Sequence, residues 1–251
     1  MEMRRPFQGV WNIIRFNWQY YVLAVSAVLF LLLIRDNLPD LLRLAAIITI
    51  VLITLTTLVS LAVSTYVYDF SALYSLDWIQ HGGIVDHMVN LHAGFDETSA
   101  LLKSKYPKAH LTILDFYYPV LHTEVSIKRA RKAYAPFPDT QPTGTSHLPL
   151  NDESIDKAFL IFAAHEIRSE KERIIFFKEL YRILKPDGEV VITEHQRDTM
   201  NFLAYNIGAF HFYSKKSWLR VFNSSGFRIK NETKITPFVT SFILCRNGAS
   251  S

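Results

Sequence analysis

Two long stretches without a charged residue constrain this chain more than any other feature. Residues 16–34 and residues 44–68 contain no Asp, Glu, Lys or Arg. Each stretch reaches the roughly 20 apolar residues that an α-helix needs to cross a hydrocarbon core of about 30 Å. The segment between them is rich in charge and contains Pro39, which predicts a tight polar turn. We therefore expect a two-helix transmembrane hairpin within residues 1–68.

The flanks of the two runs predict how the hairpin is oriented. A cleavable signal peptide has an apolar core of about 7 to 15 residues and a small-residue cleavage site, and neither is evident here. Arg4, Arg5 and Arg15 precede the first run, against Arg35 and Arg43 in the turn. Because basic residues favour the cytoplasmic side, we expect a multi-pass protein of the inner (cell) membrane whose N-terminus and C-terminal domain are both cytoplasmic.

Small hydroxyl residues recur on the second run at near-helical spacing. Thr49, Thr56, Ser60 and Ser64 would lie on one face of a helix. Such residues let helices approach closely in lipid and form hydrogen bonds between them. The spacing does not identify the partner, which is either the first helix of the hairpin or another subunit.

Composition excludes several classes for the rest of the chain. Hydrophobic residues make up 49% of the sequence and charged residues 20%, which excludes disorder, and a single cysteine excludes an intrachain disulfide scaffold. The net charge of +4 is too small and too dispersed to indicate a nucleic-acid partner. Residues 69–251 have the length of one globular domain.

Within residues 69–251, short apolar runs alternate with amphipathic, charge-rich segments. Such alternation predicts an α/β fold with a parallel sheet covered by helices, and ligands at the carboxyl ends of the strands. The expected strands are residues 84–91, 110–116, 155–163, 189–194, 227–235 and 238–245, and the expected helices are residues 96–106, 123–134, 169–184 and 214–224.

Three motifs resemble a known family. They are LPLNDESIDKAFLIFAAHEI at residues 148–167, ELYRILKPDGEVVITE at residues 179–194 and YSKKSWLRVFNSSGFRI at residues 213–229. They resemble the fourth strand, the turn into the fifth strand and the last helix of class I S-adenosylmethionine-dependent methyltransferases of the type 11-like group. The resemblance implies a Rossmann-like, seven-stranded methyltransferase fold after the hairpin, with S-adenosylmethionine as the cofactor.

The resemblance also indicates where the cofactor would bind. The segment MVNLHAGFDE, residues 88–97, stands where the family carries its glycine-rich turn. Of the family glycines only Gly94 is kept, His92 and Asp96 take the other glycine positions, and Asn90 stands where the family has Asp. Asp115 matches the acid that binds the ribose.

Two interpretations of this turn remain open. Thr145 or Ser146 stands near the position of the family's adenine-contacting acid. In one interpretation Gly94 suffices, His92 and Asp96 add contacts, and the cofactor binds. In the other, the loss of glycines leaves a fold that no longer binds it well. Carboxylates at the start of a helix, such as Asp96, are also ordinary capping groups.

Catalytic candidates follow the fourth and fifth strands. His165 and Glu166 occur in AAHE, and His195 occurs in TEHQRD. Histidine is a suitable general base near neutral pH, and a neighbouring carboxylate would raise its pKa. His122 and Glu124 are weaker candidates. The spacing of histidines and the single cysteine indicate no metal site.

Together these features predict a membrane-anchored methyltransferase that acts on a lipophilic acceptor, such as a quinol, a lipid, a polyene or a pigment precursor. Its expected partners are the lipid bilayer and either a lipophilic small molecule or a membrane protein. The alternative is a non-catalytic accessory subunit of a larger membrane complex, for example an electron-transfer or photosynthetic one. The eroded glycine turn and the hydroxyl-bearing helix face favour that alternative.

Overall fold

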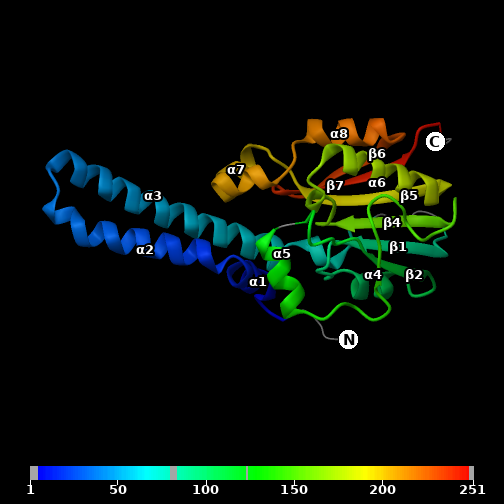
Figure 1. Cartoon of the computed structure of the whole chain (residues 1–251), viewed down its shortest axis with the longest axis horizontal. Helices are drawn as coiled ribbons and strands as arrows, with labels where there is room; N and C mark the ends of the chain where they lie inside the picture. The colour runs from blue at the N-terminus through cyan, green and yellow to red at the C-terminus, as the bar shows by residue number, and fades with distance from the viewer. Residues whose placement is uncertain (1–4, 80–83, 123, 249–251) are drawn as a thin grey trace.

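The computed structural model describes residues 5–79, 84–122 and 124–248. A long helical hairpin projects from one end of an α/β domain, as Figure 1 shows. Its helices are α2 (Trp18–Ile34) and α3 (Asp40–Thr65), which a 3₁₀ turn at Arg35–Asn37 connects. Arg4 of the basic N-terminal flank and Thr123 of an expected helix lie outside the described residues.

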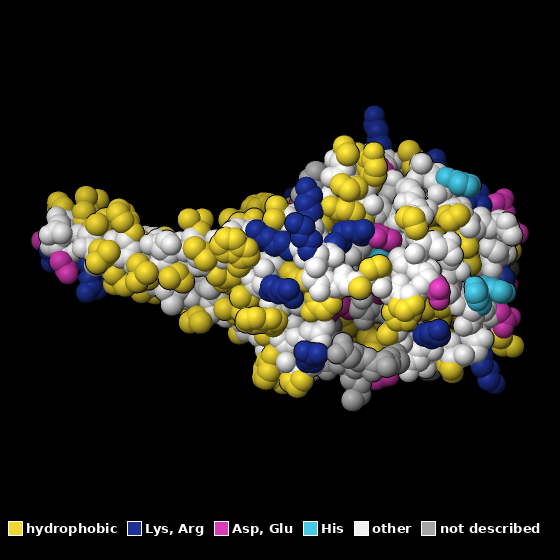
Figure 2. Space-filling view, turned by 60° about the horizontal axis from the view of Figure 1, so that its bottom comes forward, with side chains coloured by type: hydrophobic (Ala, Val, Ile, Leu, Met, Phe, Trp, Pro, Cys, Tyr) yellow, Lys and Arg dark blue, Asp and Glu magenta, His cyan; other side chains and the backbone are white. Residues whose placement is uncertain are grey.

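Both hairpin helices are long and apolar enough to cross a membrane. The segments Trp18–Asn37 and Asp40–Ser75 have mean hydropathies of 1.7 and 2.5 in their most apolar windows. Of the residues in those windows, 0% and 6% are buried, so neither helix is the core helix of a soluble fold. Figure 2 shows apolar side chains along the whole hairpin and a group of Lys and Arg where it meets the domain.

The hydroxyl groups of α3 bond mostly within their own helix. Thr49, Thr56 and Thr57 donate to carbonyls of the preceding turn at 2.7 to 2.8 Å. Ser64 is buried, at the end of α3 that packs against a later helix, Thr199–Tyr205, of the same chain. The far end of the face therefore packs against the chain's own domain.

The first apolar run is preceded by a helix that the sequence analysis did not predict. Helix α1 (Gln8–Phe16) ends where Asn17 leaves the helical conformation and its side chain donates to the Ile13 carbonyl at 3.0 Å. Asn12 and Phe16 are buried, while Trp11 is exposed. Helix α1 is thus a separate amphipathic helix between the hairpin and the domain.

The domain is built on one seven-stranded sheet in the order β3-β2-β1-β4-β5-β7-β6. Only β7 runs antiparallel to its neighbours. The Rossmann-like methyltransferase topology expected from the resemblance is therefore confirmed. The strands are β1 (His87–His92), β2 (His110–Asp115), β3 (Gln141–Pro142), β4 (Ile155–Ile161), β5 (Leu184–His195), β6 (Phe227–Thr236) and β7 (Val239–Arg246).

Helices cover both faces of the sheet, because the inner parallel strands are apolar on both sides. Val89, Leu114, Leu160 and Ile192 have 0% exposure or nearly so and belong to one core, together with Trp218 from a covering helix. The helices are α4 (Ser99–Lys105), α5 (Val125–Ala133), α6 (Glu170–Ile183), α7 (Thr199–Tyr205) and α8 (Lys215–Ser224).

Several expected elements have different ends from those predicted; β1, for example, begins at His87 and not at residue 84. Strand β3 and helix α7 were not predicted. Strand β5 begins at Leu184, directly after α6, and not at residue 189, because Leu184 already pairs with Ile155 of β4. Helix α4 begins at Ser99 and not at residue 96, because Asp96 turns back to accept the first amide groups of the helix.

The carboxyl ends of the parallel strands face the base of the hairpin (Figure 1). Three hydrogen bonds join this edge to helix α1 and to the chain segment that follows α3. Tyr68 bonds His195 at 2.8 Å, Tyr74 donates to Glu97 at 2.7 Å, and Arg129 of α5 donates to the Phe16 carbonyl at 2.6 Å. The edge at which α/β folds bind ligands therefore lies beside the apolar helices.

Candidate functional site

Polar side chains of the turn after β1 form hydrogen bonds within the turn and to the residues that begin α4. Gly94 has a φ of +94°, a conformation that favours glycine. The Nδ1 atom of His92 accepts the Gly94 amide at 2.9 Å. The amide nitrogen of Asn90 donates to Thr98 Oγ1 at 3.1 Å and to Ser99 Oγ at 2.8 Å. The hydrogen bonds of His92 and Asn90 therefore stabilise the conformation of the turn.

Asp96 has the capping role that the sequence left open. Its Oδ1 atom accepts the amides of Thr98 and Ser99, both at 2.9 Å, at the start of α4. Its Oδ2 atom and the Nε2 atom of His92 are buried, without a hydrogen-bond partner among the described residues. Burial lowers the pKa of His92, so its imidazole is neutral and Nε2 carries the proton. A donor and an acceptor are thus available within this turn.

Asp115 ends β2 and is 9% exposed. Its Oδ1 atom accepts the Tyr117 amide at 2.9 Å, and its Oδ2 atom accepts Arg131 Nη1 at 2.5 Å. The Arg131 guanidinium also stacks over the Tyr117 ring at 4.4 Å and covers Gly94, where an added Cβ would lie 1.8 Å from Nη1. Arg131 thus fills the space between the glycine turn and the predicted ribose acid. No motif in the sequence indicated this role of Arg131.

Thr145 lies at the margin of the same region. Its hydroxyl donates to Glu172 Oε1 at 2.6 Å, and that oxygen is 4.0 Å from Nε2 of His122. His122 is 1% exposed, and burial lowers its pKa although Glu172, Glu166 and Asp115 act in the opposite direction. His122 therefore lies between Asp115, the predicted cofactor acid, and the catalytic candidates after β4.

His165 and Glu166 form a buried ionic cluster at the end of β4. The Nδ1 atom of His165 lies 2.7 Å from Glu194 Oε2, and its Nε2 atom lies 3.4 Å from Glu166 Oε1. Burial works against the charged form of His165, but Glu194 and Glu166 outweigh it and hold the pKa of the imidazole well above its ordinary value. A protonated His165 donates hydrogen bonds at neutral pH and does not act as a ready base.

His211 completes this cluster from a distant segment. It ends the 3₁₀ helix Asn206–His211, and its ring meets the His165 ring edge-on at 5.1 Å. Its Nδ1 atom lies 3.3 Å from Glu124 Oε1, and the hydrogen bond from His211 lowers the pKa of Glu124. Sequence reasoning missed His211, because an aromatic, apolar segment surrounds it.

His195 lies apart from this cluster and is 4% exposed. Its Nδ1 atom faces two acceptors, the Phe238 carbonyl at 2.9 Å and Asn201 Oδ1 at 3.1 Å, so it carries the proton. Nε2 then accepts the Tyr68 hydroxyl. Burial lowers the pKa of His195 to about 4, so the ring is neutral. In this position His195 links β5 and β7 to the base of the hairpin.

Two described cavities lie at opposite ends of the sheet. A cavity of about 620 Å³ lies near the start of β4, where Lys157, Lys185 and Gly188 line it, far from the candidate residues. A second cavity, of about 360 Å³, lies at the base of the hairpin between Phe7 and Tyr74. The second cavity is on the side of the domain that carries the site.

Comparison with known proteins assigns the family. A model described as a methyltransferase domain matches residues 90–192, from β1 to β5. A methyltransferase from Aquifex aeolicus, described as dependent on S-adenosylmethionine, superposes with a TM-score of 0.52 at 16% identity, over 70% of this chain and 93% of that chain. Residues 90–192 therefore belong to a methyltransferase domain, and the domain has the fold of class I S-adenosylmethionine-dependent methyltransferases.

Two curated relatives of this methyltransferase domain have related names. The ubiquinone/menaquinone biosynthesis C-methyltransferase UbiE of Bartonella quintana is 29% identical over 131 residues, which are 51% of this chain and 48% of that protein. The demethylmenaquinone methyltransferase of Chlamydia trachomatis serovar L2 is 28% identical over 115 residues, 46% of this chain and 47% of that protein. The chain thus spans about half the length of these curated relatives.

Proposed function

We propose that this protein is a membrane-bound methyltransferase that transfers the methyl group of S-adenosylmethionine to a lipophilic acceptor of the quinol class. The observation that carries the proposal is the position of Asp115 and Gly94. They lie at the sheet edge that faces an apolar hairpin, so a cofactor bound there would face the bilayer. The names of the relatives, which refer to ubiquinone and menaquinone, support the class of acceptor.

The residues around the turn after β1 fit such a cofactor. Asp115 offers a carboxylate for ribose hydroxyls, and Gly94 leaves backbone open to close approach. The partnerless Oδ2 of Asp96 suits an ammonium group, and the proton on His92 Nε2 suits a carboxylate. When bound, S-adenosylmethionine supplies an electrophilic methyl group on its sulfonium sulfur. Arg131 must leave Asp115 before the ribose can bind, so Arg131 competes with the cofactor.

The surroundings of the site suit an acceptor that arrives from the membrane. Helix α7 packs beside α3, and α7 and the 3₁₀ helix that follows it expose large apolar side chains. Leu203 is 64% exposed, Ile207 81% and Phe210 59%. Helix α5 adds Lys128 and Lys132 next to the base of the hairpin, where basic side chains suit anionic headgroups. We propose that both spans cross the inner membrane and that the domain is cytoplasmic.

Within this proposal, His165 and Glu166 are the catalytic residues and bind the acceptor oxygen that develops charge during transfer. His195 has a positioning role, since its two ring nitrogens already bond Tyr68 and Phe238. As the methyl–carbon bond forms, the methyl–sulfur bond breaks, and the acceptor loses one proton to solvent through the buried carboxylates near Glu166.

Calorimetric titration of the full-length protein in detergent with S-adenosylmethionine tests the proposal. We expect binding in the micromolar range and at least a tenfold loss in Asp115→Asn. Asp152→Asn is the matched control, because Asp152 is an exposed carboxylate paired with Arg182. Transfer of a labelled methyl group to a demethylated quinol then identifies the acceptor class. Absence of binding at millimolar S-adenosylmethionine overturns the proposal.

One observation favours the alternative of a non-catalytic accessory subunit. The Arg131 guanidinium pairs with Asp115 and covers Gly94, so a side chain of the protein itself occupies the position predicted for the ribose. Under this alternative the pair is a permanent structural ion pair, and the hairpin packs against a partner protein. Native mass spectrometry after mild extraction distinguishes the two, because a lone monomer or homodimer contradicts the accessory role.

A further inference from the structure

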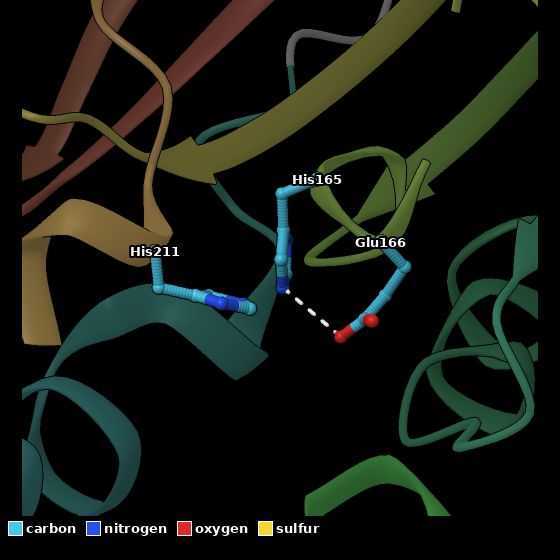
Figure 3. Close-up of side chains that lie close together, drawn as sticks. All are labelled: His165, Glu166 and His211. Atoms are coloured by element: carbon cyan, nitrogen blue, oxygen red, sulfur yellow. Dashed lines mark ion pairs between the residues drawn. The ribbon is translucent and has the colours of Figure 1, made fainter. Parts of the chain in front are cut away.

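We propose that His165, Glu166 and His211 bind one divalent transition-metal ion. One ligand atom from each side chain lies within 4.8 Å of the other two. Figure 3 shows Glu166 pointing toward His165 from the loop after β4, while the His211 ring approaches His165 from a different segment. Two imidazoles and one carboxylate form a donor set that suits zinc and other first-row metals, more than magnesium or calcium.

The distances are close to those of a loaded site. Metal–ligand bonds of about 2.0–2.2 Å in a tetrahedral site place ligand atoms roughly 3.3–3.6 Å apart. His165 Nε2 and Glu166 Oε1 are already 3.4 Å apart. A side-chain movement on the order of 1 Å would bring His211 into the same range, and a side chain at the end of a 3₁₀ helix can make such a movement.

An independent observation comes from Glu166 itself. The residue is 5% exposed, and its Oε2 atom has no hydrogen-bond partner among the described residues. Leaving a buried carboxylate oxygen without a partner costs free energy, so such an atom needs an explanation. A bound cation would supply the missing interaction.

Neighbouring carboxylates hold both imidazoles as in known metal sites. Glu194 Oε2 lies 2.7 Å from His165 Nδ1, and Glu194 Oε1 accepts the His165 amide at 3.2 Å, which leaves Nε2 directed into the cluster. Glu124 Oε1 lies 3.3 Å from His211 Nδ1. A carboxylate behind a ligating histidine orients the ring and strengthens the ligand.

The balance of charge supports a cation as well. Glu124, Glu166 and Glu194 surround the two histidines, and Arg168 is the neighbouring basic side chain. Its Nη1 atom donates to the His211 carbonyl at 2.9 Å and lies 3.5 Å from His211 Nδ1. Three carboxylates against the guanidinium and the protonated His165 leave a net negative charge, so a divalent ion can replace the His165 proton. Within the proposed methyltransferase function, on which this use of the ion rests, open coordination positions would bind the acceptor oxygen.

Zinc binding to untagged, chelator-treated, full-length protein in detergent tests the site. We expect one zinc per chain, and at least tenfold weaker binding in His211→Ala and in Glu166→Gln. Glu194→Gln tests the positioning role, with an expected 10- to 100-fold loss of zinc affinity at an unchanged stoichiometry. His147→Ala is the matched control, because His147 is an exposed histidine that also faces a carboxylate, Glu179.

X-ray absorption at the zinc edge gives a second readout that a merely structural role would not produce. A spectrum that shows two imidazole ligands and oxygen donors around the zinc supports the site. The proposal is overturned if the His165→Ala/His211→Ala variant, still folded by circular dichroism, binds as much zinc as the unmodified protein. Titration of the same samples with S-adenosylmethionine separates this result from the proposed function, since either ligand can bind when the other does not.

Discussion

Arg131 donates to Asp115 from a helix that is itself hydrogen-bonded to α1 at the base of the hairpin. On α5, Arg131 reaches Asp115 at 2.5 Å, while Arg129 two residues earlier donates to the Phe16 carbonyl. Tyr134 at the end of the same helix donates to Asn12 of α1 at 2.8 Å. Helix α5 thus connects the base of the hairpin to the predicted cofactor acid.

Removing the competing guanidinium should tighten cofactor binding. In Arg131→Ala, Asp115 is released for the ribose, and we expect the affinity for S-adenosylmethionine to rise about tenfold, which corresponds to about 1.4 kcal/mol. Lys132→Ala is the control on the same helix, and calorimetric titration measures both. Weaker binding in Arg131→Ala would mean that Arg131 is a cofactor ligand and not a competitor.

Substitution of the turn glycine should affect both stability and binding. At Gly94 an added Cβ meets Arg131, whereas at Gly248, which has a similar φ of +89°, it meets no atom within 4 Å. We expect Gly248→Ala to cost only the left-handed backbone penalty, about 1–2 kcal/mol locally. Gly94→Ala should unfold at a lower temperature and lose cofactor binding.

The double variant Gly94→Ala/Arg131→Ala separates the two effects of that methyl group. Removing Arg131 should restore part of the melting temperature, because the clash is relieved. Cofactor binding should stay lost, because the methyl group still blocks the backbone. Full recovery of binding in the double variant would contradict a role for Gly94 in the approach of the cofactor.

The contact between α1 and α5 should contribute measurably to stability. Asn12 is 4% exposed, and the Tyr134 hydroxyl is the partner of its Oδ1 atom. In Tyr134→Phe that buried acceptor loses its donor, so we expect a loss of about 1–3 kcal/mol in the free energy of unfolding. Tyr118→Phe, in an exposed ring, is the control in thermal unfolding. Equal melting temperatures would show that α1 does not stabilise α5.

His195 should make the fold sensitive to acid. Its folded pKa of about 4 lies below the ordinary value of 6.5, so the unfolded chain binds a proton first as the pH falls. The contribution of this pKa shift to the free energy of unfolding is complete above pH 6.5 and is lost progressively as the pH falls to 4. Between pH 7.5 and pH 5 we expect a loss of about 2 kcal/mol from this residue.

Thermal unfolding of His195→Asn at both pH values measures that contribution by difference. The variant should be less stable at pH 7.5, because Tyr68 and Phe238 lose a partner, and its stability should change less with pH. His147→Ala, with an exposed ring, should keep the pH dependence of the unmodified protein. A variant that keeps the full pH dependence would show that another group causes it.

The apolar runs and the alternation of strands and helices were readable from local sequence, since each depends on the identity of neighbouring residues. The two long apolar helices and six of the strands follow from such patterns, while the seven-stranded fold was implied by the resemblance to the methyltransferase family; both agree with the structure. The two-residue strand β3 was not predicted. The apolar run at residues 110–116 also predicted a strand, and Asp115 lies at the end of β2. The break at Asn17 was missed, because an apolar run does not reveal where its helix is interrupted.

Only the tertiary structure decided what surrounds the predicted residues. Arg131 reaches Asp115 from 16 positions away, and His211 reaches the cluster of His165 from a segment that follows β5. Neither pairing has a sequence signature, because parallel strands bring together chain segments that are separated by whole crossover helices. The sequence by itself determined an apolar hairpin and a methyltransferase fold. The packing of that fold decided that an arginine pairs with the predicted cofactor acid, and that two histidines and a buried carboxylate meet after β4.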